Sequence, residues 1–211
     1  MTKIKICGIQ RIEEAKWAIE AGAHAIGFVF AESRRNIDVE SAANISAQLP
    51  KDVIKIGVFV NATKQELIEI SKRVQLDYVQ LHGDETARFC KQLGIPYVKA
   101  FSVKEKYDLL LVKDYEEEMV LVDSGKGPYR GGNGTVFDWN YLESIDLKGK
   151  KLILAGGLNS ENVREAVMKV RPYMVDVSSG VETERIKDQK KIKEFVRIVQ
   201  MADEEYENLS L

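Results

Sequence analysis

Short apolar runs alternate with longer amphipathic stretches along the whole chain. Eight of the runs have the length and β-branched composition of buried strands. They cover residues 3–7, 25–30, 53–60, 78–82, 97–101, 119–124, 151–156 and 174–179. Strands that alternate with helices pair in parallel, because each crossover helix returns the chain to the same edge of the sheet. The alternation therefore predicts a parallel α/β fold.

The stretches between these strands predict the helices. They cover residues 11–21, 39–48, 63–74, 84–93, 159–169 and 188–202, with less regular patterns over 104–115 and 138–145. Thr63, Asp84 and Asn159 stand at predicted helix starts, where a polar side chain caps the first turn. Gly22 follows the first helix, where a left-handed terminating glycine is expected.

The number of strands favours a closed barrel over an open sheet. Eight units in 211 residues average about 26 residues each, which is compact but sufficient for a (β/α)8 barrel. A doubly wound sheet is the alternative, but no Gly-x-Gly-x-x-Gly turn follows the first strand. We predict a single-domain (β/α)8 TIM barrel over residues 1–211, with the last residues, about 204–211, frayed.

Composition excludes several classes of protein. The net charge is −2 and no dense Lys/Arg cluster occurs, so we predict no nucleic-acid partner. No apolar run approaches the roughly 20 residues of a membrane span, and the N-terminus lacks the pattern of a secretory signal. The two cysteines, Cys7 and Cys90, are not expected to form a disulfide. We therefore expect a cytoplasmic protein without a membrane partner.

Residues capable of chemistry follow the predicted strands, where barrels of this class carry their active sites. Cys7 ends the first strand, and a free cysteine there is either reactive or a small buried apolar residue. Asp123 ends the sixth, apolar strand, where partial desolvation favours a protonated acid; the alternative is a loop anchor. Lys5 points to the same side as Cys7 and either favours its thiolate or pairs with an acid such as Asp176.

Other strand ends suggest an anionic ligand. Gly156-Gly157 after the seventh strand and Ser178-Ser179-Gly180 after the eighth allow backbone N–H groups to approach a phosphate, although both could be simple tight turns. Arg35 could bind a carboxylate with two hydrogen bonds, and His82 is either a participant or a rim residue. His24 and His82 are not spaced as a chelating pair, so we predict no metal site.

Taken in order, these segments resemble the phosphoribosylanthranilate isomerase family. From Lys3 to about Phe195 the strings are K-I-C-G-I, G-F-V-F with S-x-R, G-V-F-V-N, V-Q-L-H-G-D-E, L-V-D, G-G-x-G-x-x-F-D-W, L-A-G-G-L-N-x-E-N-V and V-D-V-S-S-G-V-E with a later K-D. The resemblance implies a cofactor-independent Amadori rearrangement in tryptophan biosynthesis. Its substrate would be the phosphosugar N-(5-phosphoribosyl)anthranilate, its product 1-(2-carboxyphenylamino)-1-deoxyribulose 5-phosphate. It also implies a monomer or a homodimer.

The resemblance also implies residue roles. It makes Cys7 the general base, Asp123 the general acid and Arg35 the ligand of the anthranilate carboxylate. The rest of the predicted site comprises Lys5, His82 and Asp176 for substrate binding, and Gly156, Gly157, Ser178, Ser179 and Gly180 for phosphate.

The sequence departs from the family pattern at Gln10, Asn133 and Arg185, where the family usually has threonine, a hydroxyl residue and glycine, respectively. We expect these changes to affect loop rigidity and not the reaction. Arg34 is the alternative to Arg35 as the carboxylate ligand.

Two other readings stay open. One is another phosphosugar-binding barrel isomerase, such as the histidine-pathway ribonucleotide isomerase. The second is a non-catalytic ligand-binding barrel, against which the presence of both Cys7 and Asp123 argues.

Overall fold

Eight parallel strands close into a barrel in a computed structural model of the chain, which describes residues 1–116, 118–124, 137–143, 147 and 149–209. The strands follow one another around the barrel in chain order, and the last pairs with the first. They are β1 (Lys3–Cys7), β2 (Ala25–Val29), β3 (Ile54–Phe59), β4 (Tyr78–Leu81), β5 (Tyr97–Val103), β6 (Met119–Ser124), β7 (Lys151–Leu154) and β8 (Met174–Val177). The prediction of a (β/α)8 TIM barrel is confirmed.

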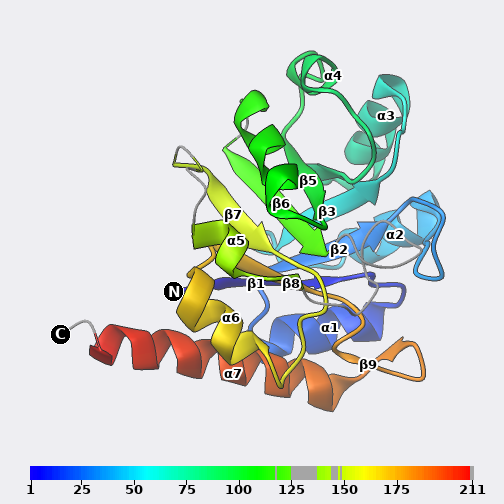
Figure 1. Ribbon diagram of the computed structural model, residues 1–211. Coiled ribbons are helices and arrows are strands. Elements are labelled where there is room, and N and C mark those ends of the chain that lie inside the picture. The colour runs from blue at the N-terminus through cyan, green and yellow to red at the C-terminus, as the bar shows by residue number, and fades with distance from the viewer. Residues whose placement is uncertain (117, 125–136, 144–146, 148, 210–211) are drawn as a thin grey trace.

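Helices surround the barrel, as Figure 1 shows. They are α1 (Ile12–Ala21), α2 (Val39–Ser46), α3 (Lys64–Val74), α4 (Ala87–Lys91), α5 (Asn140–Glu143), α6 (Val163–Val170) and α7 (Gln189–Leu209), with the 3₁₀ helix η1 (Lys106–Asp114) between β5 and β6. α7 packs against both α1 and α6, which brings the end of the chain back to its beginning. Among the described residues, no helix is long and apolar enough to cross a membrane.

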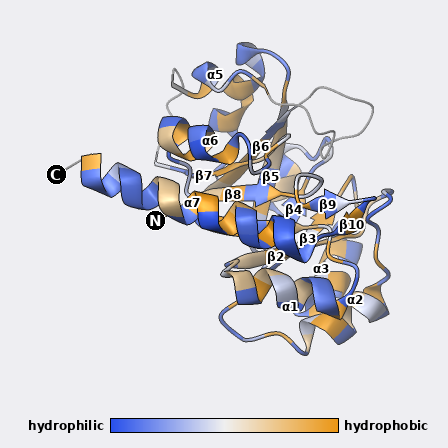
Figure 2. Ribbon diagram, turned by 90° about the horizontal axis from the view of Figure 1, so that it is seen from below, coloured by the Kyte–Doolittle hydropathy of each residue, from blue (hydrophilic) through white to orange (hydrophobic). Residues whose placement is uncertain are grey.

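Two-residue alternation along each strand separates the helix-facing core from the barrel interior. On β1, Ile4 and Ile6 join the core packed under the helices, so Lys5 and Cys7 project inward. The apolar interior cluster comprises Ala25, Ile56, Val98, Ala100, Met119, Leu121, Ile153, Ala155 and Met174. Hydrophilic and hydrophobic residues alternate along α7 (Figure 2), whose buried face includes Phe195 and Val199. The helices thus keep water from the outside of the barrel.

Capping residues explain where several helices begin and end. Thr63 accepts a hydrogen bond from the backbone N–H of Glu66 at the start of α3, as predicted, and Gly22 ends α1 with φ of 102°. The fourth helix begins later than predicted, because the side chain of Thr86, not of Asp84, caps it. α6 likewise begins at Val163, since the Asn159 side chain accepts from the two backbone N–H groups before it.

The last helix is longer than the predicted range of residues 188–202. α7 continues to Leu209, because its last turns contact the rest of the molecule. Asp203 accepts hydrogen bonds from the backbone N–H and the hydroxyl of Thr2. Arg164 of α6 donates to Glu205 at 3.0 Å. These contacts join residues far apart in sequence, so local composition did not indicate them. Residues 210 and 211 lie outside the described part.

A short hairpin after β8 was not predicted. Its strands are β9 (Glu182–Thr183) and β10 (Ile186–Lys187), which pair antiparallel. Glu184 and Arg185 form the turn with φ of 50° and 70°, a left-handed geometry that normally favours glycine or asparagine. The sequence has neither residue there, which explains why the turn was not recognised. Figure 1 shows the hairpin projecting from one end of the barrel.

Candidate active site

Lys5 anchors a buried polar group inside the barrel. It is completely buried, and its ammonium donates to Gln80 Oε1 and to Asp176 Oδ2, each at 2.9 Å. The register of the sheet places Lys5 of β1 beside Asp176 of β8, which fixes the ion pair. The predicted pairing of Lys5 with Asp176 is therefore present.

Cys7 lies one step further along β1, towards the mouth of the barrel. Its partner in the register is Gly27 of β2. A Cβ at Gly27 would lie 2.8 Å from the Cys7 sulfur and 3.1 Å from Cε of Lys5. The missing side chain thus gives the thiol and the lysine room on the same inner face. Cys7 is a free cysteine, 8% exposed, so it opens slightly to the mouth.

Burial and the charges near Cys7 shift the pKa of its thiol in opposite directions. Burial raises the pKa of the Cys7 thiol, the positive charges of Lys5 and Lys187 lower it, Asp176 raises it, and the net result lies above the usual value. Burial also lowers the pKa of Lys5, but Asp176 and Cys7 outweigh burial and raise it overall. The charge of Lys5 thus lowers the pKa of Cys7 without overcoming the cost of burial.

Replacing Lys5 by methionine is expected to raise the pKa of Cys7 further. The variant removes an attractive positive charge and leaves the negative Asp176 nearby, and both changes disfavour the thiolate. The measurement is the rate of Cys7 alkylation by iodoacetamide against pH, which rises as the thiol ionises. Lys16→Met on the exposed face of α1 is the matched control. An alkylation profile unchanged from that control would exclude Lys5 from this role.

Asp123 occupies the inner face of β6, and His82 lies nearby at the end of β4. Both side chains are buried, and His82 Nε2 lies 3.8 Å from Asp123 Oδ2. Gly156, with φ of 87°, approaches so closely that a Cβ there would lie 2.4 Å from the backbone nitrogen of Ser124 and 2.8 Å from Asp123 Oδ1. Only glycine fits this position without moving the aspartate.

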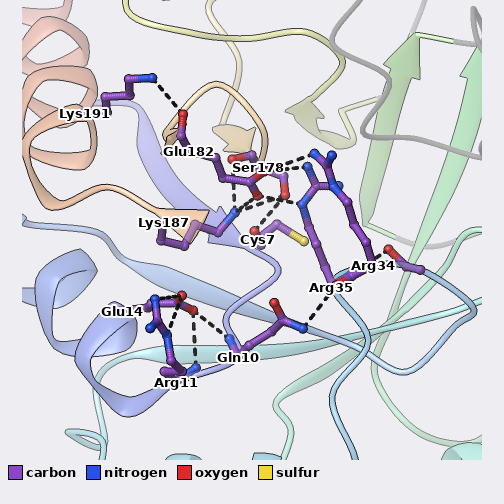
Figure 3. Close-up of polar contacts among 11 residues, drawn as sticks. Cys7, Gln10, Arg11, Glu14, Arg34, Arg35, Ser178, Glu182, Lys187 and Lys191 are labelled. Atoms are coloured by element: carbon purple, nitrogen blue, oxygen red, sulfur yellow. Dashed lines mark hydrogen bonds and ion pairs between the residues drawn. The ribbon is translucent and has the colours of Figure 1, made fainter. Parts of the chain in front are cut away.

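A cluster of charges surrounds Glu182 of β9. Its carboxylate accepts from Arg35 Nε at 2.7 Å and Nη2 at 3.0 Å, from Lys187 at 2.8 Å and from Arg34 at 3.1 Å. Figure 3 shows the arginines and Lys187 converging on Glu182, with Cys7 beside them. Burial disfavours ionised Glu182, but the hydrogen bonds from Arg35 and Lys187 outweigh burial and hold its pKa below the usual value.

The same cluster reaches the backbone of Cys7. Lys187 donates to the carbonyl of Ser178 at 3.0 Å and to its hydroxyl oxygen at 3.2 Å. That hydroxyl in turn donates to the carbonyl of Cys7 at 2.9 Å. Burial lowers the pKa of Lys187 despite the opposing attraction of Glu182. The end of β8 and the end of β1 are therefore held together at the mouth of the barrel.

The loops after β7 and β8 also lie side by side. Asn159 and Gly180 form an isolated parallel bridge, and a Cβ at Gly180 would collide with the carbonyl of Leu158. Gly157 has φ of 66°. Within the described residues, no hydrogen bond engages the backbone N–H of Gly157 or Ser179. The two predicted phosphate loops are thus adjacent and have backbone donors to offer.

The departures from the family pattern have different outcomes. Gln10 donates to the backbone carbonyls of Arg34 and Asn36, at 3.3 and 2.9 Å, so it braces the loop after β2. Arg185 sits in the left-handed hairpin turn. Asn133, with the surrounding loop 131–134, lies outside the described residues.

The geometry agrees with comparisons to known proteins. The family model described as N-(5'phosphoribosyl)anthranilate (PRA) isomerase matches residues 4–198. The chain belongs to this isomerase family. An N-(5'-phosphoribosyl)anthranilate isomerase of Bacillus cereus (strain G9842) is 51% identical over 195 residues, covering 92% of this chain and 96% of the relative. The predicted family and enzyme class are confirmed.

Solved structures of the isomerase family share the fold. The crystal structure of phosphoribosyl anthranilate isomerase from Thermotoga maritima has a TM-score of 0.90 and 40% identity, covering 95% of this chain and all of that chain. Another structure, of the isomerase in complex with reduced 1-(o-carboxyphenylamino)-1-deoxyribulose 5-phosphate, has a TM-score of 0.84 and 39% identity, with coverages of 95% and 100%. The described residues of this family member contain no cluster of three potential metal ligands.

Three residues of this isomerase-family site were not predicted: Gln80, Glu182 and Lys187. Gln80 lies in the string V-Q-L-H, while Glu182 and Lys187 lie in V-E and in the late K-D, so the strings contained them without indicating a role. An inward position two residues before His82 was the available signal for Gln80. The hairpin that carries the other two was the missing element.

Proposed function

We propose that the protein isomerises N-(5'-phosphoribosyl)anthranilate by an Amadori rearrangement in tryptophan biosynthesis, with Cys7 as general base and Asp123 as general acid. The observation that carries the proposal is the pair of inward side chains on β1 and β6 at the same end of one barrel. Membership of the family supports the substrate. A monomer or homodimer stays a prediction.

Asp123 supplies the first proton in this proposal. Protonated, it gives a proton to the ribose ring oxygen while the anthranilate nitrogen pushes the ring open to an iminium ion. Its burial at 5% exposure supports a role as acid, because desolvation disfavours a bare carboxylate. The neighbouring Gly156 lets the loop after β7 close around it.

Cys7 performs the second transfer. As thiolate it removes the proton from C2 of the iminium, and the resulting enolamine tautomerises to the ketone. The pKa of Cys7 lies above its usual value, so the free enzyme has little thiolate at neutral pH and gains it as the pH rises. This base therefore makes kcat/KM increase towards alkaline pH. Lys5 and Lys187 lower the cost of the thiolate.

The phosphate and the carboxylate of the substrate give it two anchors. The backbone N–H groups of Gly157 and Ser179, which make no hydrogen bond within the described residues, support phosphate binding at the adjoining loops. Arg35 is the proposed carboxylate ligand, since Glu182 orients its guanidinium through Nε and Nη2 and leaves Nη1 for the substrate. Arg34 is more exposed and makes one contact with Glu182.

Replacing Arg35 by alanine is expected to raise KM about 30-fold, which corresponds to roughly 2 kcal/mol for a charged hydrogen-bond pair. The turnover number kcat should change much less, because Arg35 holds the substrate remote from the reacting carbon. Steady-state kinetics measure both values. Arg34→Ala is the matched control, and a larger rise of KM in that variant would assign the carboxylate to Arg34 instead.

The direct test is turnover. Phosphoribosylanthranilate, prepared from anthranilate and phosphoribosyl pyrophosphate, loses its fluorescence as it is converted to the aminoketose. A falling signal in proportion to protein concentration is the expected result. A constant signal would contradict the proposal and favour a non-catalytic binding barrel.

A further inference from the structure

A chain of buried side chains crosses the barrel from the side of Cys7 to the side of Asp123. It runs from Lys5 through Gln80, on β4, to His82, the residue that follows β4. Gln80 is 2% exposed and His82 is 7% exposed. These three side chains lie between the two proposed catalytic groups. The donors and acceptors that each side chain carries fix the direction of each hydrogen bond.

The orientation of the Gln80 amide follows from Lys5. An ammonium group has only donors, so the atom of Gln80 that lies 2.9 Å from Lys5 Nζ must be the oxygen. Asp176, on the other side of Lys5, takes a second donor and holds the lysine in place. The amide nitrogen of Gln80 must then point the other way.

That nitrogen fixes the tautomer of His82. Gln80 Nε2 lies 3.2 Å from His82 Nδ1, and an amide nitrogen can only donate. Nδ1 therefore accepts, and the proton of the neutral imidazole is on Nε2. A proton on Nδ1 would place the N–H of His82 opposite the N–H of the Gln80 amide, leaving no acceptor between them. Nε2, with its proton, is the ring atom that lies 3.8 Å from Asp123 Oδ2.

We propose that Gln80 is a positioning residue that holds His82 as the Nε2–H tautomer and directs this N–H at the carboxylate of Asp123. The distance of 3.8 Å is longer than a hydrogen bond, and such contacts shorten when an active site closes on its ligand. The proposal gives Gln80 and His82 a role in the acid half of the reaction.

The consequence for catalysis rests on the proposed function. When Asp123 gives its proton to the ring oxygen, a buried carboxylate is left behind, which is costly without a donor. The Nε2–H of His82 is a donor close to this carboxylate as the charge develops, so it stabilises the transition state more than the ground state. Loss of the tautomer should therefore lower kcat and leave KM nearly unchanged.

The test is nitrogen NMR of the protein with ¹⁵N-labelled histidine, which distinguishes protonated from unprotonated ring nitrogens. The chain has only two histidines, and His24 is an internal reference because its Nδ1 accepts from the backbone N–H of Ile4 at 3.2 Å. The expected spectrum at neutral pH shows His82 as the Nε2–H tautomer. A Nδ1–H tautomer in the unaltered protein would overturn the proposal.

Gln80→Glu reverses the hydrogen bond, because a carboxylate can only accept. His82 should then carry a proton on Nδ1, with the signals of His24 unchanged. Gln80→Met, which places no new charge beside Lys5, should release His82 to a mixture of tautomers. Gln48→Glu, at an exposed position two residues after α2, is the matched control and should alter neither histidine. An unaltered His82 in both Gln80 variants would refute the assignment.

Kinetics complete the test. Gln80→Met should lower kcat at least 10-fold with KM within about twofold. A changed tautomer with unchanged kcat would overturn the proposal that the positioning of His82 by Gln80 matters for catalysis. The NMR measurement needs no substrate, so it remains readable if the protein fails to turn over phosphoribosylanthranilate, and the two failures are distinguishable.

Discussion

Replacing Cys7 by alanine is expected to lower kcat by about 10²–10⁴-fold, the usual contribution of a general base. The fold should persist, because the thiol is small and lies at the mouth of the barrel, with Gly27 as its nearest neighbour across the sheet. KM should change little, since the proposed anchors of phosphate and carboxylate are elsewhere. Fluorescence turnover at saturating substrate measures the loss, and circular dichroism checks the fold.

Cys90 provides the control within the same chain. It is buried on α4 and packs with Phe59, Leu67 and Leu93, away from the polar interior. Cys90→Ala should lose some stability through the small cavity, but it should keep turnover within about twofold. Near-normal turnover of the Cys7 variant would show that another group removes the C2 proton.

The periodicity of the sequence was sufficient to predict the barrel, because parallel strands buried on both faces are apolar throughout and differ clearly from amphipathic helices. Strand β1 was predicted to the residue. Helix starts were less predictable. From the sequence, Asp84 and Thr86 are equally good N-cap residues for the fourth helix. The folded structure shows that Thr86 is the cap. The extension of α7 depends on Thr2 and Arg164, which no local window includes.

The site was predictable to the extent that barrels place their chemistry after the strands. The structure brings Lys5, Cys7 and Asp176 together at one end, and the loops of Gly157 and Ser179 meet beside them. The partners of Arg35 were not predictable. Glu182 and Lys187 reach it through a hairpin whose turn lacks glycine, so its sequence gives no turn signal.

Asp123→Asn is expected to lower kcat by about 10²–10⁴-fold, because the amide has the shape of the acid but cannot donate an acidic proton to the ring oxygen. The close approach of Gly156 is kept, so the loop after β7 should not move. Asp52→Asn, at an exposed turn before β3, makes the same substitution at the surface and should leave kcat unchanged. If Asp123→Asn retained near-normal turnover, the acid would have to be another group.

Combining Cys7→Ala with Asp123→Asn tests whether the two groups act in separate steps, each with its own transition state, or in one step. In the proposed mechanism Asp123 acts when the ring opens and Cys7 acts when C2 loses its proton, so each substitution raises a different barrier. The overall rate follows the higher barrier, and the double variant should lose about as much kcat as the worse single variant. A loss equal to the product of the single losses would mean that both groups act in the same step, with ring opening and proton removal concerted.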